Sequence, residues 1–455
     1  MAKRVKYDDL LDRVDLLLGR VDELVIENKS LRKRLDKYEG KKNSNNSSMP
    51  PSQDPNRPKP NQSLRKASGK KPGGQKGRLG STLKRISTPD EIVILSPLEC
   101  VRCGNSLEKI SGVKSNSRQI VDIPKIKAVF TEYQSYSKTC TCGCSSTAPF
   151  PDHIKYPVSY GENMEALISY FHARQYLPFA RMKELFNDVF HVNISEGGIH
   201  CLLNRFARKT DTIYQEIKNR ISESSVIGTD ETGINVNKKK HWYWTWQTDK
   251  LTFISHSSNR GFATINKLFP EGFSQSILVH DGWKAQLKTA AHDHQTCIPH
   301  LLRRLNYLNE RYDKNKWSVS FSEILLDALK LKSKMLPQEY PYSSARNELN
   351  KRLDTLLKIP PNKELKELYS FCKRMNREKE QLFTFLYNEN VPGDNNASER
   401  AIRNVKVKQK ISGQFKKEQT AQDFAQIRSI IDTTIKNGLN VIDALRLVAK
   451  FEFNL

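Results

Sequence analysis

The stretch VIGTDETGINV, residues 226–236, places an acidic side chain, Asp230, inside a predicted strand, directly after Val226-Ile227-Gly228-Thr229. Two more β-rich runs follow after tight turns, HWYWTWQT at 241–248 and LTFISHS at 251–257. Together the three runs predict an antiparallel meander. A charged residue inside such a strand is costly unless it is paired or bound to a metal, so Asp230 is a candidate functional residue.

A second acid ends another predicted strand. The run GFATINKLF at 261–269 predicts a helix, and SILVHDG at 276–282 predicts a buried strand that ends at Asp281. If this strand neighbours the strand of Asp230, both carboxylates emerge at one edge of the sheet. We therefore predict an α/β fold with an acidic edge. A turn or helix-cap role is the alternative for either aspartate taken alone.

A third acid stands early in a late helical pattern, GDNNASERAIRNVKVKQKISGQF at 393–415. Its one glutamate, Glu399, would complete a site with Asp230 and Asp281. Mg²⁺ prefers oxygen ligands, and two ions about 4 Å apart clamp the attacking and leaving oxygens of a phosphoryl transfer. The alternative is a solvated helix whose first acid is favoured by the helix dipole. Three acids in the order strand, strand, helix favour the metal site.

Cations follow Glu399 along the same helix, and the whole chain is basic. Arg403, Lys406 and Lys410 are placed to neutralise DNA phosphates. The 455 residues carry a net charge of +25, which predicts a polyanionic partner, with nucleic acid as the default. No apolar run approaches the length of a membrane span and no signal peptide opens the chain. We expect a cytoplasmic protein with no membrane partner.

The blocks GTDETGINVNKKKHWYWTW, ILVHDGW and DNNASERAIRNVKVKQKISGQF resemble the three catalytic blocks of the insertion sequence 66 family of DDE transposases. The stretches NSSMPPSQD and KPGGQKGRLG resemble the family's N-terminal linker, and NGLNVIDALRLV resembles its C-terminal tail. The resemblance implies an RNase H-like fold in which Asp230, Asp281 and Glu399 are catalytic and bind two Mg²⁺ or Mn²⁺ ions. It also implies a bacterial, nucleoid-associated enzyme that cleaves transposon-end DNA with water and joins the freed 3′-hydroxyl to target DNA. Accessory proteins of the same element are candidate partners.

The N-terminal part, 1–39, predicts a parallel two-stranded leucine zipper. Leucines recur every seven residues at Leu10, Leu17, Leu24 and Leu31, with Val14, Val21, Asn28 and Leu35 at the other seam position. The alternative is an amphipathic helix packed on its own domain. Residues 40–88 are too polar to fold alone; they predict a basic disordered linker, which either lies along DNA or is a plain solvated connection.

Cysteines cluster in the next part, 89–157, and predict a small zinc-binding module. Cys100 and Cys103 form a C-x₂-C knuckle, and the second half offers Cys140 and Cys144, with Cys142 as an alternative ligand for one structural Zn²⁺. Free buried thiols are the other reading. The runs 92–95 and 128–131 predict strands.

The remaining parts are helical except for the sheet. Residues 158–224 predict a helical DNA-binding or connecting domain with helix-turn-helix proportions, for which plain packing helices are the simpler reading. Residues 225–420 predict the RNase H-like catalytic domain with a helical insertion at about 301–390, and 421–455 predict C-terminal helices. We interpret His294, Cys297 and His300 as packing residues of the insertion. Trp283 is either a core residue or a platform for a flipped base.

Three functions fit these features. The first is a DDE transposase that works at least as a dimer. The second is a dimeric DNA-binding regulator with an inactive RNase H-like domain, which the intact set of three acids disfavours. The third is a nuclease without strand transfer. The zipper, the basic linker and the zinc module disfavour this third function, because a simple nuclease needs no pairing of two DNA ends.

Overall fold

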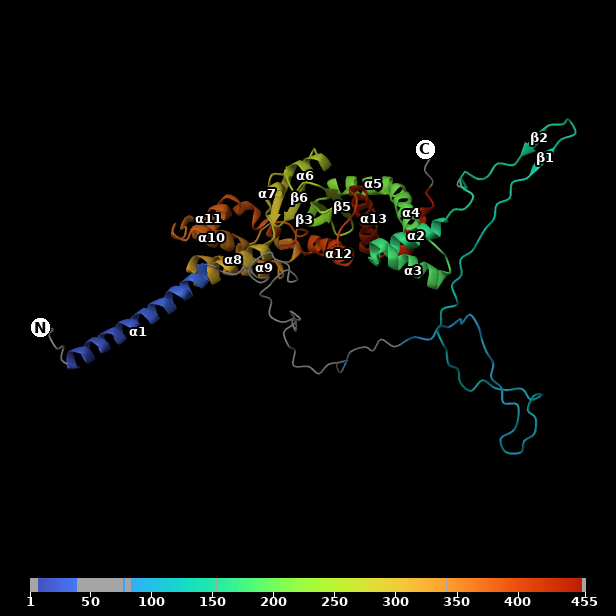
Figure 1. The fold of residues 1–455 in the computed structure, drawn as a ribbon, viewed down its shortest axis with the longest axis horizontal. Coiled ribbons are helices and arrows are strands. Elements are labelled where there is room, and N and C mark those ends of the chain that lie inside the picture. The colour runs from blue at the N-terminus through green and yellow to red at the C-terminus, as the bar shows by residue number, and fades with distance from the viewer. Residues whose placement is uncertain (1–6, 39–76, 78–82, 153, 341, 452–455) are drawn as a thin grey trace. The chain divides into compact units, whose positions relative to one another are not determined.

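The computed structural model describes residues 7–38, 77, 83–152, 154–340 and 342–451 (Figure 1). These residues belong to two compact units, one formed by Pro58–Val129 and the other by Met1–Arg57 with Phe130–Leu455. The predicted linker at 40–88, with the two family-like stretches inside it, lies almost wholly outside the described residues. Within the described part of the chain, no helix has both the length and the apolar character needed to cross a bilayer.

The N-terminal segment forms one unbroken helix, α1, Tyr7–Tyr38, where the heptad pattern predicts it. The seam side chains within residues 13–32 are exposed, among them Val14, Leu17, Val21, Leu24 and Leu31. Within residues 13–32, apolar side chains at this spacing are left uncovered along one helix face, which is what a coiled-coil partner would cover. Pairing of two such helices remains a prediction.

The predicted strands of the cysteine-bearing part are wrong. Residues 92–95 and 128–131 form neither strand nor helix, and their apolar side chains, such as Ile94 and Val129, are exposed. Because no neighbouring layer buries these side chains, their β propensity has nothing to stabilise it. The regular structure of the region is instead a short hairpin of β1, Ser137–Thr139, and β2, Ser145–Thr147.

A five-stranded sheet forms the centre of the larger unit. Its strands are β3 Val226–Val236, β4 Lys239–Gln247, β5 Thr252–Ser257, β6 Phe273–His280 and β7 Ala291–Thr296. The order is β5-β4-β3-β6-β7, with β3, β4 and β5 antiparallel and with β6 parallel to both β3 and β7. The predicted meander and the strand before Asp281 are confirmed.

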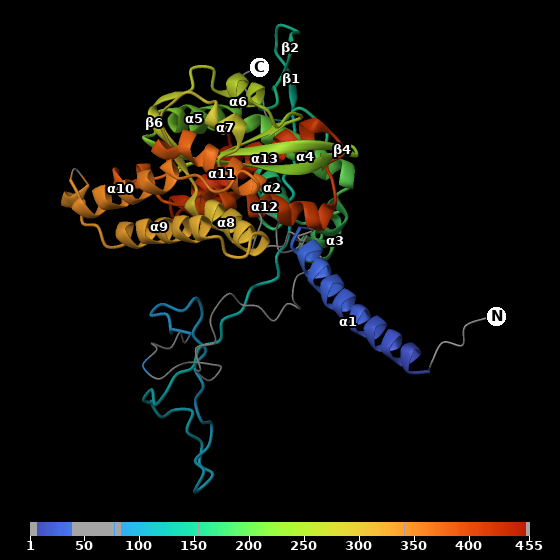
Figure 2. The same cartoon turned by 90° about the vertical axis from the view of Figure 1, so that its left-hand side faces the viewer.

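Helices cover both faces of this sheet (Figures 1 and 2). One face, with Ile234 and Tyr243, packs with α2 Glu162–Ser169, α3 Phe179–Phe190, α4 Glu196–Lys209, α12 Asn396–Ser412, α13 Glu418–Lys436 and α14 Val441–Ala449. The other face, with Ile227 and Trp244, packs with α5 Asp211–Ser222, α6 Phe262–Leu268 and α7 Lys284–Leu287. The helices predicted for 158–224 and for the C-terminal part are therefore present, and each buries one face. A DNA-binding role of 158–224 remains a prediction.

The helical insertion forms a core of its own. It contains α8 Ile298–Arg311, α9 Lys316–Lys332, α10 Ser344–Lys358 and α11 Lys366–Arg377, followed by 3₁₀ turns up to Leu386. Its apolar cluster includes Phe321 and Phe385 and reaches the sheet at Ile277 and Val279. The two ends of the insertion meet, because the Ile298 backbone N–H donates to the Gly393 carbonyl at 3.0 Å.

Candidate functional site

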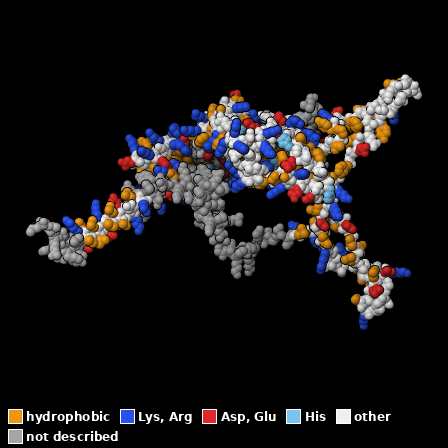
Figure 3. All heavy atoms as spheres, viewed as in Figure 1, with side chains coloured by type: hydrophobic (Ala, Val, Ile, Leu, Met, Phe, Trp, Pro, Cys, Tyr) orange, Lys and Arg blue, Asp and Glu red, His pale blue; other side chains and the backbone are white. Residues whose placement is uncertain are grey.

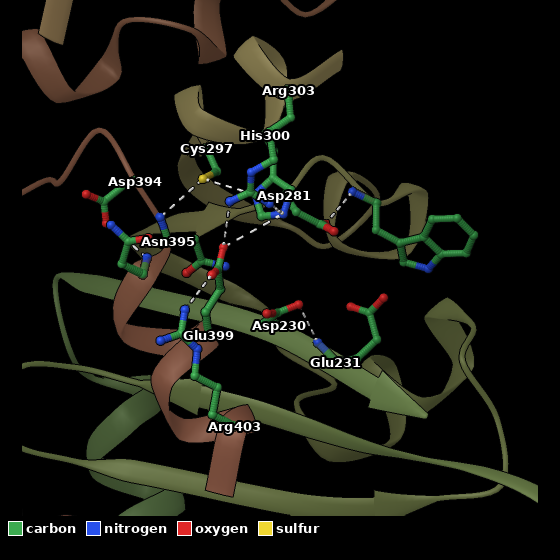
Figure 4. A network of polar contacts seen from close by, with 12 residues as sticks. Asp230, Glu231, Asp281, Cys297, His300, Arg303, Asp394, Asn395, Glu399 and Arg403 are labelled. Atoms are coloured by element: carbon green, nitrogen blue, oxygen red, sulfur yellow. Dashed lines mark hydrogen bonds and ion pairs between the residues drawn. The ribbon is translucent and has the colours of Figure 1, made fainter. Parts of the chain in front are cut away.

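The sheet register brings the two aspartates together. Strand β6 runs parallel to β3 with Val226 opposite Ile277 and Gly228 opposite Val279. Continuing this register sets Asp281, the residue after β6, opposite Asp230. Figure 4 shows both carboxylates at the same edge. The Asp281 Oδ1 accepts a hydrogen bond from the Trp283 backbone N–H at 3.1 Å.

Helix α12 brings Glu399 to the aspartates (Figure 4). The Asn395 side chain, just before the helix, donates to the Thr229 carbonyl at 2.8 Å. Helix and strand approach each other closely at Gly228, where an added Cβ would lie 2.5 Å from the Gln247 Nε2 and 2.7 Å from the Ser398 Oγ. A glycine is therefore required for Glu399, one residue further along, to reach the strand that carries Asp230.

Three cationic or polar groups surround the Glu399 carboxylate. Its oxygens lie 3.4 Å from the Arg303 Nη2, 3.7 Å from the Arg403 Nη2 and 3.8 Å from the His300 Nε2. Arg403 is one turn along the same helix, whereas Arg303 and His300 come from α8 of the insertion. The carboxylate is thus held from two elements that are far apart in the sequence.

The Cys-x-x-His pair does more than pack. The His300 Nδ1 lies 3.2 Å from the Cys297 Sγ, and this sulfur also accepts a hydrogen bond from the Asn395 backbone N–H at 3.3 Å. The pair therefore joins the start of α8 to the start of α12 and places His300 beside Glu399. The three-residue spacing, which puts both side chains on one helix face, was the sequence signal for this contact.

Burial and neighbouring carboxylates both disfavour the charged form of the acids in this site. Burial raises the pKa of Asp230 well above its usual range, and the neighbouring carboxylates of Asp281, Glu231 and Glu399 raise it further. Burial, with Asp281 as the second cause, also raises the pKa of Glu231 to about 7, although Arg260 opposes this shift. Such repulsion is relieved by a bound cation, and the donors are all carboxylate oxygens, which suit Mg²⁺ or Mn²⁺.

The spacing of the acids bears on the number of ions. Among the described residues, Asp230, Asp281 and Glu399 do not form a group whose ligand atoms all lie within 4.8 Å of one another. One ion shared by all three would require the carboxylates to close in. Two ions about 4 Å apart would span a wider set of ligands.

Sequence reasoning missed a further acid at this edge, Glu231, which follows Asp230 directly on β3. Side chains alternate along a strand, so Glu231 points to the face opposite Asp230. There its Oε1 accepts from the Arg260 Nη2 at 2.7 Å and its Oε2 accepts from the Gln286 side chain at 3.2 Å. The Arg260 guanidinium lies 3.9 Å from the ring centre of Trp283. One face of this tryptophan is therefore covered by a cation of the protein itself.

The predicted DNA-binding cations fall into two groups. Arg403 and Lys410 are exposed on α12. Lys406 is half-buried, and its Nζ donates to the Gly233 carbonyl at 3.3 Å. Burial, together with the nearby Lys240, lowers the pKa of Lys406. Lys408 is buried with its Nζ 3.3 Å from the His172 Nδ1. Of these four cations, the exposed ones are Arg403, which also pairs with Glu399, and Lys410.

The two halves of the predicted zinc site lie in different units. In one unit, Cys100 and Cys103 form a turn in which the Gly104 backbone N–H donates to the Cys100 carbonyl at 2.9 Å. In the other unit, Cys140, Cys142 and Cys144 occupy the turn of the β1–β2 hairpin. The backbone N–H of Arg102 is the main group that lowers the pKa of Cys100. The backbone N–H of Cys142 is the main group that lowers the pKa of Cys140. A lowered pKa makes the thiolate, the form that binds zinc, easier to reach at Cys100 and Cys140.

Comparison with known proteins identifies two families. The family described as "Transposase IS66 family" matches residues 157–423. This match covers more than half of the chain and includes the sheet, the insertion and all three acids. A second family, described as "Family of unknown function (DUF6444)", matches residues 11–84 and covers most of α1. No curated protein matches the chain.

Proposed function

Since the chain belongs to the transposase IS66 family, we propose that it is the DDE transposase of an insertion sequence. It binds the ends of the element, cleaves the DNA there and joins the freed 3′-hydroxyl to a target. The convergence of Asp230, Asp281 and Glu399 from two adjacent strands and a helix is the observation that carries this proposal. The strand order β5-β4-β3-β6-β7, three antiparallel strands followed by two parallel ones, supports an RNase H-like fold.

The three acids are proposed as the ligands of two Mg²⁺ or Mn²⁺ ions. When bound, the ions lower the pKa of the attacking water or hydroxyl and stabilise the leaving oxygen. Arg303 and His300 orient Glu399 toward the aspartates. The hydrogen bond from the Trp283 backbone fixes the rotamer of Asp281.

Cations around this edge are proposed to bind the DNA backbone. Arg403 and Lys410 are exposed on the helix that carries Glu399 and would each neutralise a phosphate. The face shown in Figure 3 carries many Lys and Arg side chains around the sheet. Lys406 contributes less than the sequence predicts, because its Nζ already donates to the Gly233 carbonyl.

The N-terminal parts are proposed to serve recognition and pairing. The exposed seam of α1 would pair two chains in parallel, which suits an enzyme that must act on two DNA ends. One structural Zn²⁺ held by Cys100, Cys103, Cys140 and Cys144, with Cys142 as an alternative, would fold the cysteine module. Action on DNA would place the chain at the nucleoid, with accessory proteins of the element as further partners.

A strand-transfer assay tests the proposal. The full chain is incubated with labelled DNA that carries one end of the element, a supercoiled target plasmid and Mg²⁺. We expect labelled product joined to the plasmid, and we expect Asp281→Asn to abolish cleavage and joining. The matched control, Glu348→Gln, changes an exposed acid on α10 and should act as the parent does.

The same assay separates the alternatives. Binding of the labelled end without cleavage would support a regulator with an inactive domain. Cleavage without any joined product would support a nuclease.

A further inference from the structure

Two histidines stack on each other at the edge of the sheet, away from the three acids. His241 lies on β4 and His256 on the adjacent edge strand β5. Their rings are 5.1 Å apart and nearly parallel, at 13°. The His241 Nδ1 and the His256 Nε2 are 3.0 Å apart. Two ring nitrogens thus face each other from neighbouring strands, with His241 buried and His256 half-buried.

A carboxylate from a third element faces this pair. Glu418 is the first residue of α13, and one ligand atom from each of His241, His256 and Glu418 can be chosen so that all three lie within 4.8 Å of one another. Within the described residues, the Glu418 carboxylate has no hydrogen bond or salt bridge. The segment before it is fixed to the sheet, because the Phe415 N–H donates to the Asn235 carbonyl at 3.0 Å.

We propose that His241, His256 and Glu418 form a second metal site that takes a divalent transition ion of the zinc type. Zinc bound by nitrogen at about 2.0–2.1 Å in a tetrahedron requires ligand atoms about 3.3 Å apart. The histidine nitrogens already have nearly this separation. Glu418 is exposed and closes the remaining gap by rotating its side chain.

The lysines around the site and its imidazole ligands favour a transition-metal ion over Mg²⁺ or Ca²⁺. A hollow of about 310 Å³ adjoins it, lined by His241, Glu418, Lys239, Lys416 and Lys417 among others. Three ammonium groups repel any cation, so the ion must be held by strong ligand bonds rather than by net charge. Imidazole provides such bonds to zinc, copper and nickel, whereas Mg²⁺ and Ca²⁺ prefer oxygen. The hollow leaves room for a water as the fourth ligand.

An ion in this site would tie three elements together. Helix α12 ends at Ser412, and a short connection leads from it to Glu418. Binding at Glu418 would hold this connection against the edge strands β4 and β5. The site does not depend on the proposed transposase reaction, since none of its ligands belongs to the acidic edge.

Zinc titration of the full chain tests the proposal. The parent is compared with Glu418→Gln, His256→Gln and the control His292→Gln, which changes an exposed histidine on β7. Bound zinc per chain is measured at equilibrium in excess Mg²⁺, and the melting temperature is measured with and without zinc. Zinc held by the cysteines is common to all four proteins, so only the difference between them reports on this site.

We expect the parent and His292→Gln to bind one more zinc than the two site variants at low zinc concentration. Loss of a group that merely supports a metal ligand weakens affinity about 10- to 100-fold, so removal of a ligand should weaken it at least tenfold. The zinc-dependent rise in melting temperature should shrink in parallel. Equal zinc affinity in all four proteins would overturn the proposal, and so would a Glu418→Gln variant that binds like the parent. Glu418 is exposed, so its variant is expected to fold.

Discussion

Replacing Glu399 with glutamine separates the chemistry of this site from its stability. The substitution keeps the size of the side chain and removes one negative charge. Arg303, His300 and Arg403 lie 3.4–3.8 Å from the carboxylate. Partly exposed ion pairs of this kind contribute about 0–1 kcal/mol each. The lost attraction is offset because Glu399 no longer repels Asp230, whose pKa it helps to raise. The free energy of unfolding should therefore change by about 1 kcal/mol or less.

Cleavage should respond far more strongly. Metal ions supply several kcal/mol of transition-state stabilisation, and about 1.4 kcal/mol corresponds to a tenfold change in rate. Loss of a metal ligand is thus expected to reduce the cleavage rate by about a hundredfold or more. Binding of end DNA should persist, because other cations supply it. Arg403→Gln, in contrast, should weaken the binding of end DNA. If Arg403 makes one phosphate contact, the slope of log affinity against log salt concentration should become shallower by about one unit.

The assay combines cleavage of labelled end DNA in Mg²⁺ or Mn²⁺, binding at several salt concentrations and urea denaturation. Glu348→Gln, on α10, is the matched control for charge removal from a helix. If Glu399→Gln cuts as fast as the parent while Asp230→Asn does not, Glu399 is a solvated helix acid and the assignment of the site is wrong.

Four further outcomes are expected. Gly228→Ala should destabilise the fold by about 1–3 kcal/mol in urea denaturation, because its Cβ meets the side chains of Gln247 and Ser398; an unchanged midpoint would contradict the close contact. Without metal, protonation of Glu231, with a folded-state pKa of about 7 against a usual 4.5, should make stability fall by about 3 kcal/mol as pH rises from 4.5 to 7, and Glu231→Gln should lack this part of the slope. Leu24→Lys should convert a dimer into a monomer in sedimentation experiments, unless the zipper is not the dimer contact. Cys103→Ser should release one zinc per chain, and an unchanged metal content would exclude that ligand.

The acids could be located from the sequence because a charged side chain is unfavourable in a buried strand. Asp230 follows the run Val226-Ile227-Gly228-Thr229 inside a strand pattern and Asp281 ends an apolar run, so burial and charge together single them out. The partners of these acids could not be located in this way. Arg260 reaches Glu231 only because β3 and the start of α6 are neighbours in space, and His300 reaches Glu399 only because the insertion folds back.

Local sequence patterns also missed one strand that forms and predicted another that does not. Strand β7, AHDHQT, was not predicted, because its polar and charged residues do not alternate with apolar ones. Its stability comes from pairing with β6. Residues 92–95, in contrast, have high β propensity and form no strand, because nothing covers their side chains. Both errors arise from tertiary context, which local propensity does not contain.

Because the two ends of the helical insertion contact each other, the insertion leaves the sheet and returns to it at nearly the same place. The chain leaves the sheet at Cys297 and returns at Gly393 and Asn395, where backbone and sulfur hydrogen bonds join the exit to the entry. Later parts of the insertion also hold the sheet, because the Phe385 backbone N–H donates to the Gln295 side chain of β7 at 2.8 Å. Changes in length between the first turns of α8 and this contact would affect the spacing of the carboxylates least. The cost of closing a longer loop grows only slowly with its length. The outer part of the insertion can therefore change in length and sequence while the acidic edge keeps its geometry.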